Sequence, residues 1–136
     1  MSSIGVSPVD QKKHASLTNG TGATTQAGAV IVIKADAAGN VFTTTSTNGD
    51  NKVFGVTTES IADLLSGRIL TEGKTTALLV ANGTSSIAIG DWLSTYSHAY
   101  YAKKAVAGDM AFALSLSTPT TGTAQVSALL VSPRLI

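Results

Sequence analysis

The sequence predicts an all-β protein, a small barrel- or sandwich-like domain assembled from two degenerate repeats. Short β-branched runs are separated by Gly, Asn and Asp turn signals about every 8–12 residues, a spacing typical of barrels and sandwiches. The same order of signals also occurs twice, each time with an entry after a glycine, Gly28 or Gly90, and a late Ala-Leu-Leu-Val run. A fixed order of strands and turns that appears twice indicates repeat halves of about 28–81 and 90–132.

The composition is that of one domain with little charge. A chain of 136 residues fits one domain that buries about two-thirds of its extended-chain surface. Only 12% of the residues are charged, against a usual value of about 25%, and small residues such as Thr, Ser, Ala and Gly are abundant. Such a surface suits close packing against neighbouring subunits, because burying an unpaired charge is costly.

Charge, cysteine content and hydropathy argue against several classes of function. The net charge is +1 and the nine Lys and Arg residues are scattered, whereas nucleic-acid binding needs a concentrated basic face. Cysteine is absent, so disulfides and thiolate sites are impossible. No apolar run reaches the ~20 residues of a membrane span. Residues 1–6 lack the pattern of a signal peptide, so we expect a protein made and kept on the cytoplasmic side.

Residues 1–27 are predicted to form an arm outside the β domain of residues 28–136. The few large apolar residues of this segment lie mainly near its start, and a proline among them removes a donor that a regular strand would need. The segment is either a disordered leader or an extended segment that becomes ordered against a partner. In the second case the candidate contacts are Ile4, Val6, Pro8 and Val9.

The strands of the first half follow from β-branched runs between turn signals. Residues 29–33 form such a run, and we expect protein to cover both of its faces. The Asn-Gly pair at residues 48–49 tolerates the positive φ of a tight hairpin turn. A further turn is expected at residues 72–73. The strands expected in this half span residues 29–33, 41–47, 53–57, 68–71 and 75–81.

A short helix is predicted from Ser60 to Leu65. Ser60 and Asp63 have the spacing of a capping box, with Asp in place of the usual Glu or Gln. Leu64 and Leu65 continue an apolar stripe, and Gly67 is a typical C-terminal stop.

The second half repeats the pattern without a helix. Turn signals fall near residues 97–98, 107–109 and 119–122. The expected strands span residues 91–97, 100–104, 110–117 and 123–131.

The sequence contains no strong catalytic or metal-binding motif. The Gly-Lys-Thr run at residues 73–75 mimics the end of a phosphate-binding loop, but Arg68 stands where that loop needs glycine, and a strand follows instead of a helix. The two histidines, His14 and His98, belong to no ligand-spaced cluster, and no Gly-x-Ser-x-Gly elbow occurs. We therefore expect no enzymatic activity, no cofactor and no metal site.

One aromatic cluster, at residues 96–101, is a candidate sugar- or partner-binding patch. Its tyrosines are Tyr96, Tyr100 and Tyr101. The alternative is cross-strand aromatic packing beside an exposed turn. Asp91 and Asp109 both follow glycine at a strand entry, where an aspartate more often hydrogen-bonds its own turn than acts as an acid or base.

Several turns of small residues beside short apolar runs occur in an order that resembles a known protein family. These stretches are residues 53–56, 67–69, 73–75, 81–83, 89–92 and 107–113. Their order over about 28–132 resembles that of the head-decoration, or capsid cement, proteins of tailed bacteriophages. The likeness is one of strand order and turns, and it includes no catalytic motif.

The resemblance implies a small β-barrel-like protein that binds the outside of a matured capsid between capsomers. It implies a homotrimer whose partner is the major capsid protein, with neighbouring capsid subunits clamped against the pressure of packaged DNA. The expected location is the outer capsid surface of the virion, after synthesis in the host cytoplasm. A clamp of this kind needs no chemistry, because a trimer that engages several subunits gains avidity from weak single contacts.

Two other functions stay open. A glycan- or receptor-binding β module of a phage fibre or head appendage would use the tyrosine cluster together with His98. A hydrolase would use His98 with Asp91 or Asp109 and would turn over ester or glycoside substrates.

Overall fold

The computed structural model describes residues 12–34, 39–81, 87–97, 99–119 and 123–136. These residues form strands, turns and loops and contain no helix, which confirms the predicted all-β class. No helix capable of crossing a membrane therefore occurs in the described part of the chain. The strands are β1 (Lys13–Asn19), β2 (Val30–Ile33), β3 (Val41–Thr43), β4 (Val53–Thr57), β5 (Ser66–Ala81), β6 (Trp92–Thr95), β7 (Ala102–Lys104), β8 (Met110–Ser115) and β9 (Thr123–Leu135).

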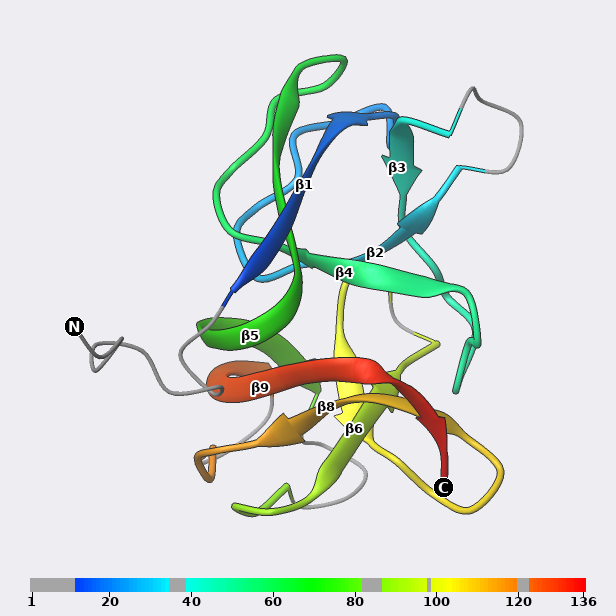
Figure 1. Ribbon diagram of the computed structural model, residues 1–136, viewed down its shortest axis with the longest axis vertical. Coiled ribbons are helices and arrows are strands. Elements are labelled where there is room, and N and C mark those ends of the chain that lie inside the picture. Colours follow the sequence, from blue (N-terminus) through cyan, green and yellow to red (C-terminus); the bar gives the residue numbers. More distant parts are fainter. Residues whose placement is uncertain (1–11, 35–38, 82–86, 98, 120–122) are drawn as a thin grey trace, which may run out of the picture.

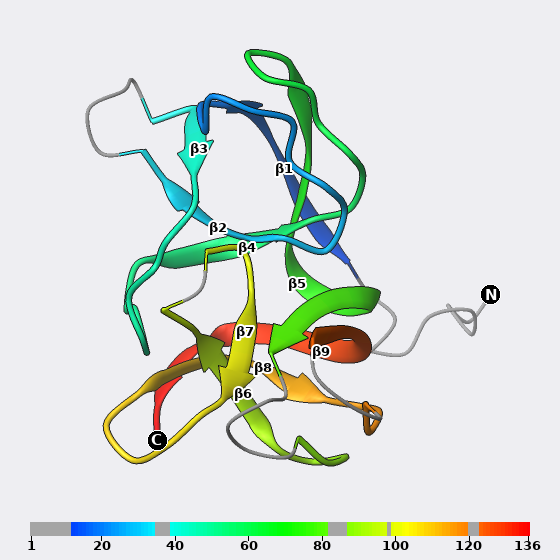
Figure 2. The ribbon, with the colours of Figure 1, turned by 180° about the vertical axis from the view of Figure 1, so that it is seen from behind.

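The strands close into two small barrels that share one strand (Figure 1). In the first ring the order is β1-β3-β2-β4-β5, and β5 pairs back with β1. In the second ring the order is β5-β7-β6-β8-β9, and β9 pairs back with β5. Figure 1 shows the first ring above the second, and the view from behind in Figure 2 brings β7 of the second ring to the front.

The two rings have the same topology. Each strand of the first ring corresponds to the strand four places later in the second. The parallel pair β1–β3 corresponds to the parallel pair β5–β7, and the remaining neighbours are antiparallel in both rings. The repeated strand order therefore begins at β1 and again within β5, whereas the sequence comparison placed the starts at Gly28 and Gly90. The Ala-Leu-Leu-Val runs of β5 and β9, which that comparison treated as equivalent, lie on paired strands of the same ring, with Leu78 opposite Val126.

Strand β5 passes from one ring to the other without turning back. Its first half pairs with β1 through Glu72, and its second half pairs with β9 from Gly73 onward. The turn predicted at residues 72–73 is therefore wrong. Gly73 does have the positive φ of a turn residue, 114°. The two halves of β5 nevertheless pair with different strands, so the chain continues as one strand of 16 residues.

The core follows the two-residue period of the strands. In β2, Val30 belongs to a cluster that continues into the second ring, while the next residue, Ile31, lies in a cluster confined to the first ring. In β5, Leu70 and Ile69 divide in the same way. Successive side chains of a strand point to opposite faces, so one strand contributes to both clusters. Both faces of β2 are covered, as the β-branched run predicted.

The ring junction is held by backbone contacts as well as by the core. The N–H of Leu79 donates to the carbonyl of Gly28 at 2.9 Å. Gly28 has a φ of +85°, and a Cβ built there would lie 1.7 Å from the carbonyl oxygen of Ala77. Only glycine allows this approach. The loop before β4 adds polar contacts, because the N–H of Asp50 donates to Thr95 Oγ1 at 2.6 Å across the junction.

The helix predicted from Ser60 to Leu65 is absent. The backbone of Ile61 instead exchanges two hydrogen bonds with Thr25, at 2.8 and 2.9 Å, and Leu64 has a φ of +65° that no α-helix contains. The Asp63 carboxylate accepts the N–H of Gly22 at 3.1 Å instead of capping a helix. Pairing with a distant loop has overridden the local helix signal.

The arm predicted over residues 1–27 is too long. Lys13–Asn19 form β1, which closes the first ring, and residues beyond it pack on the loop before β5. The strand is hard to see in the sequence because its two buried positions are Leu17 and a polar residue, Asn19. The candidate contacts Ile4, Val6, Pro8 and Val9 lie outside the described residues.

Candidate partner-binding surfaces

The tyrosine cluster lies in the connection between β6 and β7, beside the first ring. Tyr96, Tyr100 and Tyr101 are all half-buried, and His98 lies outside the described residues. Tyr100 has a φ of +75°, which is uncommon for a residue with a side chain. Its N–H donates to Thr44 Oγ1 at 3.0 Å, and its carbonyl accepts the N–H of Val30 at 3.0 Å. The backbone of Tyr100 thus connects the β6–β7 loop of the second ring to the first ring and fixes the loop that carries the tyrosines.

Asp109 is the centre of a nearly buried charge cluster in the second ring. Lys103 Nζ lies 2.5 Å from Asp109 Oδ2, and each side chain is 13% exposed. The same carboxylate oxygen accepts hydrogen bonds from the Ser94 hydroxyl and from the N–H of Val106. Burial alone would raise the pKa of Asp109, but these hydrogen bonds and the charge of Lys103 outweigh it and lower the pKa below its ordinary value. The carboxylate therefore stays ionised and holds its turn.

Asp91 has a similar but more exposed role. Its Oδ2 accepts the N–H of Ala88 at 2.8 Å and lies 3.5 Å from Lys104 Nζ, with side chains 23% and 42% exposed. Both aspartates considered for acid–base chemistry are thus engaged with their own turns. Among the described residues no group of three metal-ligating side chains occurs, and every buried side-chain polar atom has a partner.

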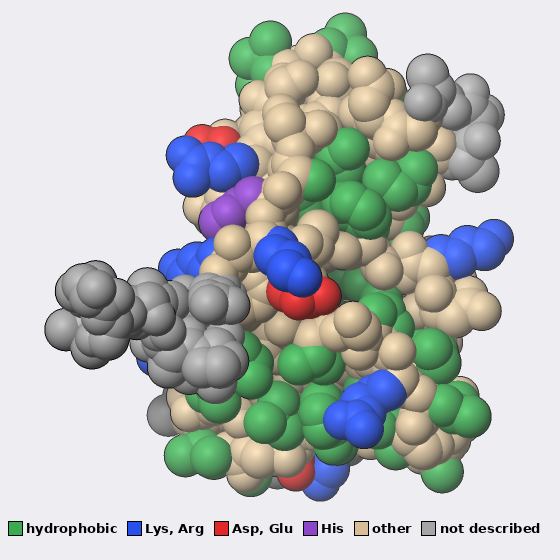
Figure 3. Space-filling model, in the orientation of Figure 1, with side chains coloured by type: hydrophobic (Ala, Val, Ile, Leu, Met, Phe, Trp, Pro, Cys, Tyr) green, Lys and Arg blue, Asp and Glu red, His purple; other side chains and the backbone are tan. Residues whose placement is uncertain are grey.

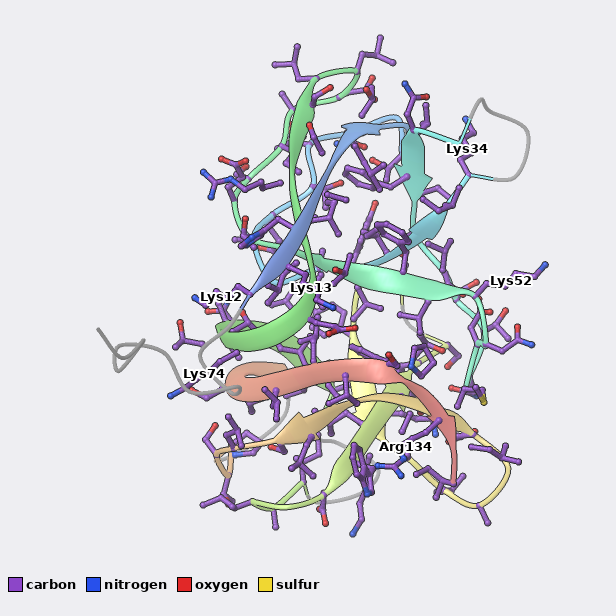
Figure 4. The ribbon with its side chains drawn as sticks, in the orientation of Figure 1. Lys12, Lys13, Lys34, Lys52, Lys74 and Arg134 are labelled. Atoms are coloured by element: carbon purple, nitrogen blue, oxygen red, sulfur yellow. The ribbon has the colours of Figure 1, made fainter. Side chains whose placement is uncertain are left out.

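Two grooves flank the place where β5 crosses between the rings. The first, of about 360 Å³, is largely apolar, and Phe54, Phe112 and Pro133 are among its lining residues. The second, of about 550 Å³, is lined by threonines together with Lys12 and Lys74. Figure 4 shows these two lysines on the same flank, while Lys34, Lys52 and Arg134 lie elsewhere on the molecule. Lys12 and Lys74 are therefore the cations that line the second groove.

The loop between β4 and β5 forms the far end of the first ring, at the top of Figure 1. Leu64 and Leu65 lie at its tip and are 74% and 60% exposed, and hydrophobic side chains are visible at this end in Figure 3. Asn19 holds this tip from inside. Its backbone N–H donates to the Leu65 carbonyl at 2.9 Å, and its carbonyl accepts the Leu64 N–H at 3.0 Å. We call Leu64 and Leu65 the leucine tip.

The sequence did not single out the leucine tip as a surface feature. The pair continues the apolar stripe of the predicted helix, and no local signal distinguishes such a stripe from two leucines on an exposed turn. The leucine tip is identified only in the folded structure, because the φ of Leu64 and its contact with Asn19 depend on two loops that are distant in the sequence.

The molecule is a double barrel of two topologically equivalent five-strand rings fused through one strand. The structure is similar to a known structure, that of the head fibre gp8.5 N base of bacteriophage phi29. The two structures align with a TM-score of 0.60 and 14% sequence identity, over 91% of this chain and 99% of the phi29 chain. This likeness shows a shared fold. No protein family model and no curated protein sequence matches the chain.

Proposed function

We propose that this protein is a non-enzymatic structural component of a bacteriophage head. The observation that carries the proposal is the double-barrel fold, which the phi29 head fibre base shares along almost its whole length. The name of that protein supports a head appendage, and the decoration function implied by the sequence resemblance is one form that an appendage can take.

The interior of the molecule suits a mechanical role. The larger core cluster runs from Val30 and Leu70 in the first ring to Leu93, Phe112 and Val126 in the second, so the rings share apolar packing. Close-packed protein interiors resist deformation. The polar groups of the described interior are satisfied by one another, which fits a protein whose purpose is contact.

We further propose that the protein forms a homotrimer on the outer capsid surface and clamps neighbouring major capsid subunits. A trimer presents three copies of each surface, and simultaneous engagement raises the overall affinity well above that of one contact. Few charges need to be desolvated when such surfaces meet, since only 12% of the residues are charged.

Binding to purified phage heads tests this function. The protein should sediment as a trimer and bind mature, expanded heads at a saturating ratio, with little uptake by compact precursor shells. Heads that carry it should retain their DNA to a higher temperature. A protein that remains monomeric at all concentrations and is not taken up by heads would contradict the proposal.

A second candidate function is glycan or receptor binding by a head appendage. The observation in its favour is the Tyr100 backbone, because strained residues held by their surroundings gather at functional sites. We expect no signal on a glycan array. Binding that disappears in Tyr100→Gly, a change compatible with the positive φ, would make this second function the better one.

A further inference from the structure

We infer that the leucine tip is the part of the molecule that inserts into an apolar pocket on the capsid subunit. This inference rests on the proposed function and adds to it the residues that make the contact. Four properties of the tip carry it: its exposure, its backbone conformation, the contacts that hold it and its size.

The tip places two large apolar side chains in solvent at a backbone cost. Leu64 is 74% exposed and has a φ of +65°. A residue with a Cβ is strained in this left-handed region, and only Gly, Asn and Asp adopt it readily. The fold itself gains little from a leucine there, because most of the Leu64 side chain stays exposed in the described structure. A turn built for folding alone would carry glycine or asparagine.

Asn19 fixes the tip in this conformation. The side chain is fully buried, and its Nδ2 donates to the carbonyls of Ala23 and Ile61 at 2.8 Å each. Its Oδ1 accepts the N–H of Thr21 at 2.9 Å. With its backbone bonded to both tip residues, Asn19 joins the loop after β1 to the loop before β5. A contact surface that is already ordered loses less entropy when it binds.

The size and surroundings of the tip indicate the kind of partner. Two leucine side chains offer far less than the roughly 1,000 Å² that a stable interface buries, so the tip cannot by itself join two copies of this chain. It suits a partner that is engaged at several points at once, as a lattice of capsid subunits is. Glu59 and Asp63 belong to the same loop, and their charges disfavour an anionic lipid surface.

The test compares tip variants with a matched control for binding to purified mature heads. Leu64→Asn and Leu64→Gly keep the backbone and remove the apolar side chain. Each should weaken head binding by about tenfold or more per protomer, leave the oligomeric state unchanged, and leave the midpoint of thermal unfolding equal or higher by a few degrees. Ile89→Asn is the control, since Ile89 is 68% exposed and lies in the loop before β6 of the second ring, and this variant should bind like the native protein.

The outcomes separate this inference from the proposed function. If the native protein binds no heads, the proposed function fails and the inference fails with it. If the native protein binds and the Leu64 variants bind equally well, only the inference is overturned. It is also overturned if Ile89→Asn weakens binding to the same extent, if a Leu64 variant changes the oligomeric state, or if the Leu64 variants unfold at a lower temperature.

Discussion

Replacement of Asp109 by alanine should lower the free energy of unfolding by about 3 kcal/mol, because the change leaves a nearly buried lysine without its counter-charge. Lys103 lies against Asp109 with both side chains only 13% exposed. The change also removes the acceptor of the Ser94 hydroxyl and of the Val106 N–H. Each buried group that loses its partner adds to the cost. Urea unfolding of both proteins gives the difference.

Two neighbouring lysines provide a control for this result. Lys103→Met removes the buried partner and should also cost about 2–3 kcal/mol, since the Asp109 carboxylate is then left without its nearby positive charge. Lys104→Met removes the more exposed partner of Asp91 and should change stability by less than about 1 kcal/mol. Equal effects of the two lysine variants would show that the buried pair is worth no more than a surface pair.

The contribution of the Asp109 carboxylate to stability should depend on pH with a definite sign. The pKa of Asp109 is lower in the folded protein than its ordinary value, so the folded state favours the ionised form. The stabilisation from this group is therefore fully present above the ordinary aspartate pKa of about 4, and is lost as the pH falls through the lower folded value. The stability difference between native protein and Asp109→Asn should stay constant from pH 5 to 8 and narrow below about pH 4.

Strands with strong local signals could be predicted from the sequence. The β-branched run of β2 and the Val-Phe-Gly-Val run of β4 appear close to where they were expected, at Val30–Ile33 and Val53–Thr57. Turn glycines also appear where expected, with positive φ at Gly49 and Gly108. These features depend on residues close together in the chain, which a sequence pattern describes well.

Features decided by distant contacts could not be predicted. A turn signal at residues 72–73 was overridden because β1 and β9 each pair with one half of β5. A helix signal from Ser60 to Leu65 was overridden because Asn19 and Thr25 supply other hydrogen-bond partners. The repeat was detected in the sequence, but the shared strand hides where each copy starts, since β5 ends one ring and begins the other.

The two candidate surfaces differ in the same way, since one is set by residues close together in the chain and the other by distant contacts. The tyrosine cluster could be found from the sequence alone, because the chain has few aromatic residues and its three tyrosines lie close together. The leucine tip could not, because the residue that defines it, Asn19, lies some forty-five positions earlier in the chain. The inference about head binding therefore depends on a polar residue that looks like part of a loop in the sequence and is fully buried in the fold.

Removal of the Asn19 side chain should disorganise the leucine tip and lower the free energy of unfolding by about 3 kcal/mol, since the hydrogen bonds of this buried amide to Ala23, Ile61 and Thr21 are lost together. Asn19→Ala leaves the carbonyls of Ala23 and Ile61 without their Nδ2 donor. Asn19→Asp has nearly the same shape but points a second oxygen at those carbonyls, so it should cost at least as much. The more exposed Asn48 provides the control, and Asn48→Ala should cost less than about 1 kcal/mol.

Hydrogen exchange distinguishes a local effect at the tip from a general loss of stability. The N–H of Leu64 donates to the Asn19 carbonyl, and the N–H of Leu65 donates to the Ala62 carbonyl. In Asn19→Ala both amides should exchange much faster, while amides of the second ring, such as that of Leu93, should accelerate only by the amount that global destabilisation explains. Tip amides that stay as protected as in the native protein would show that the Asn19 side chain is not needed to hold the tip and that the backbone hydrogen bonds of residue 19 suffice.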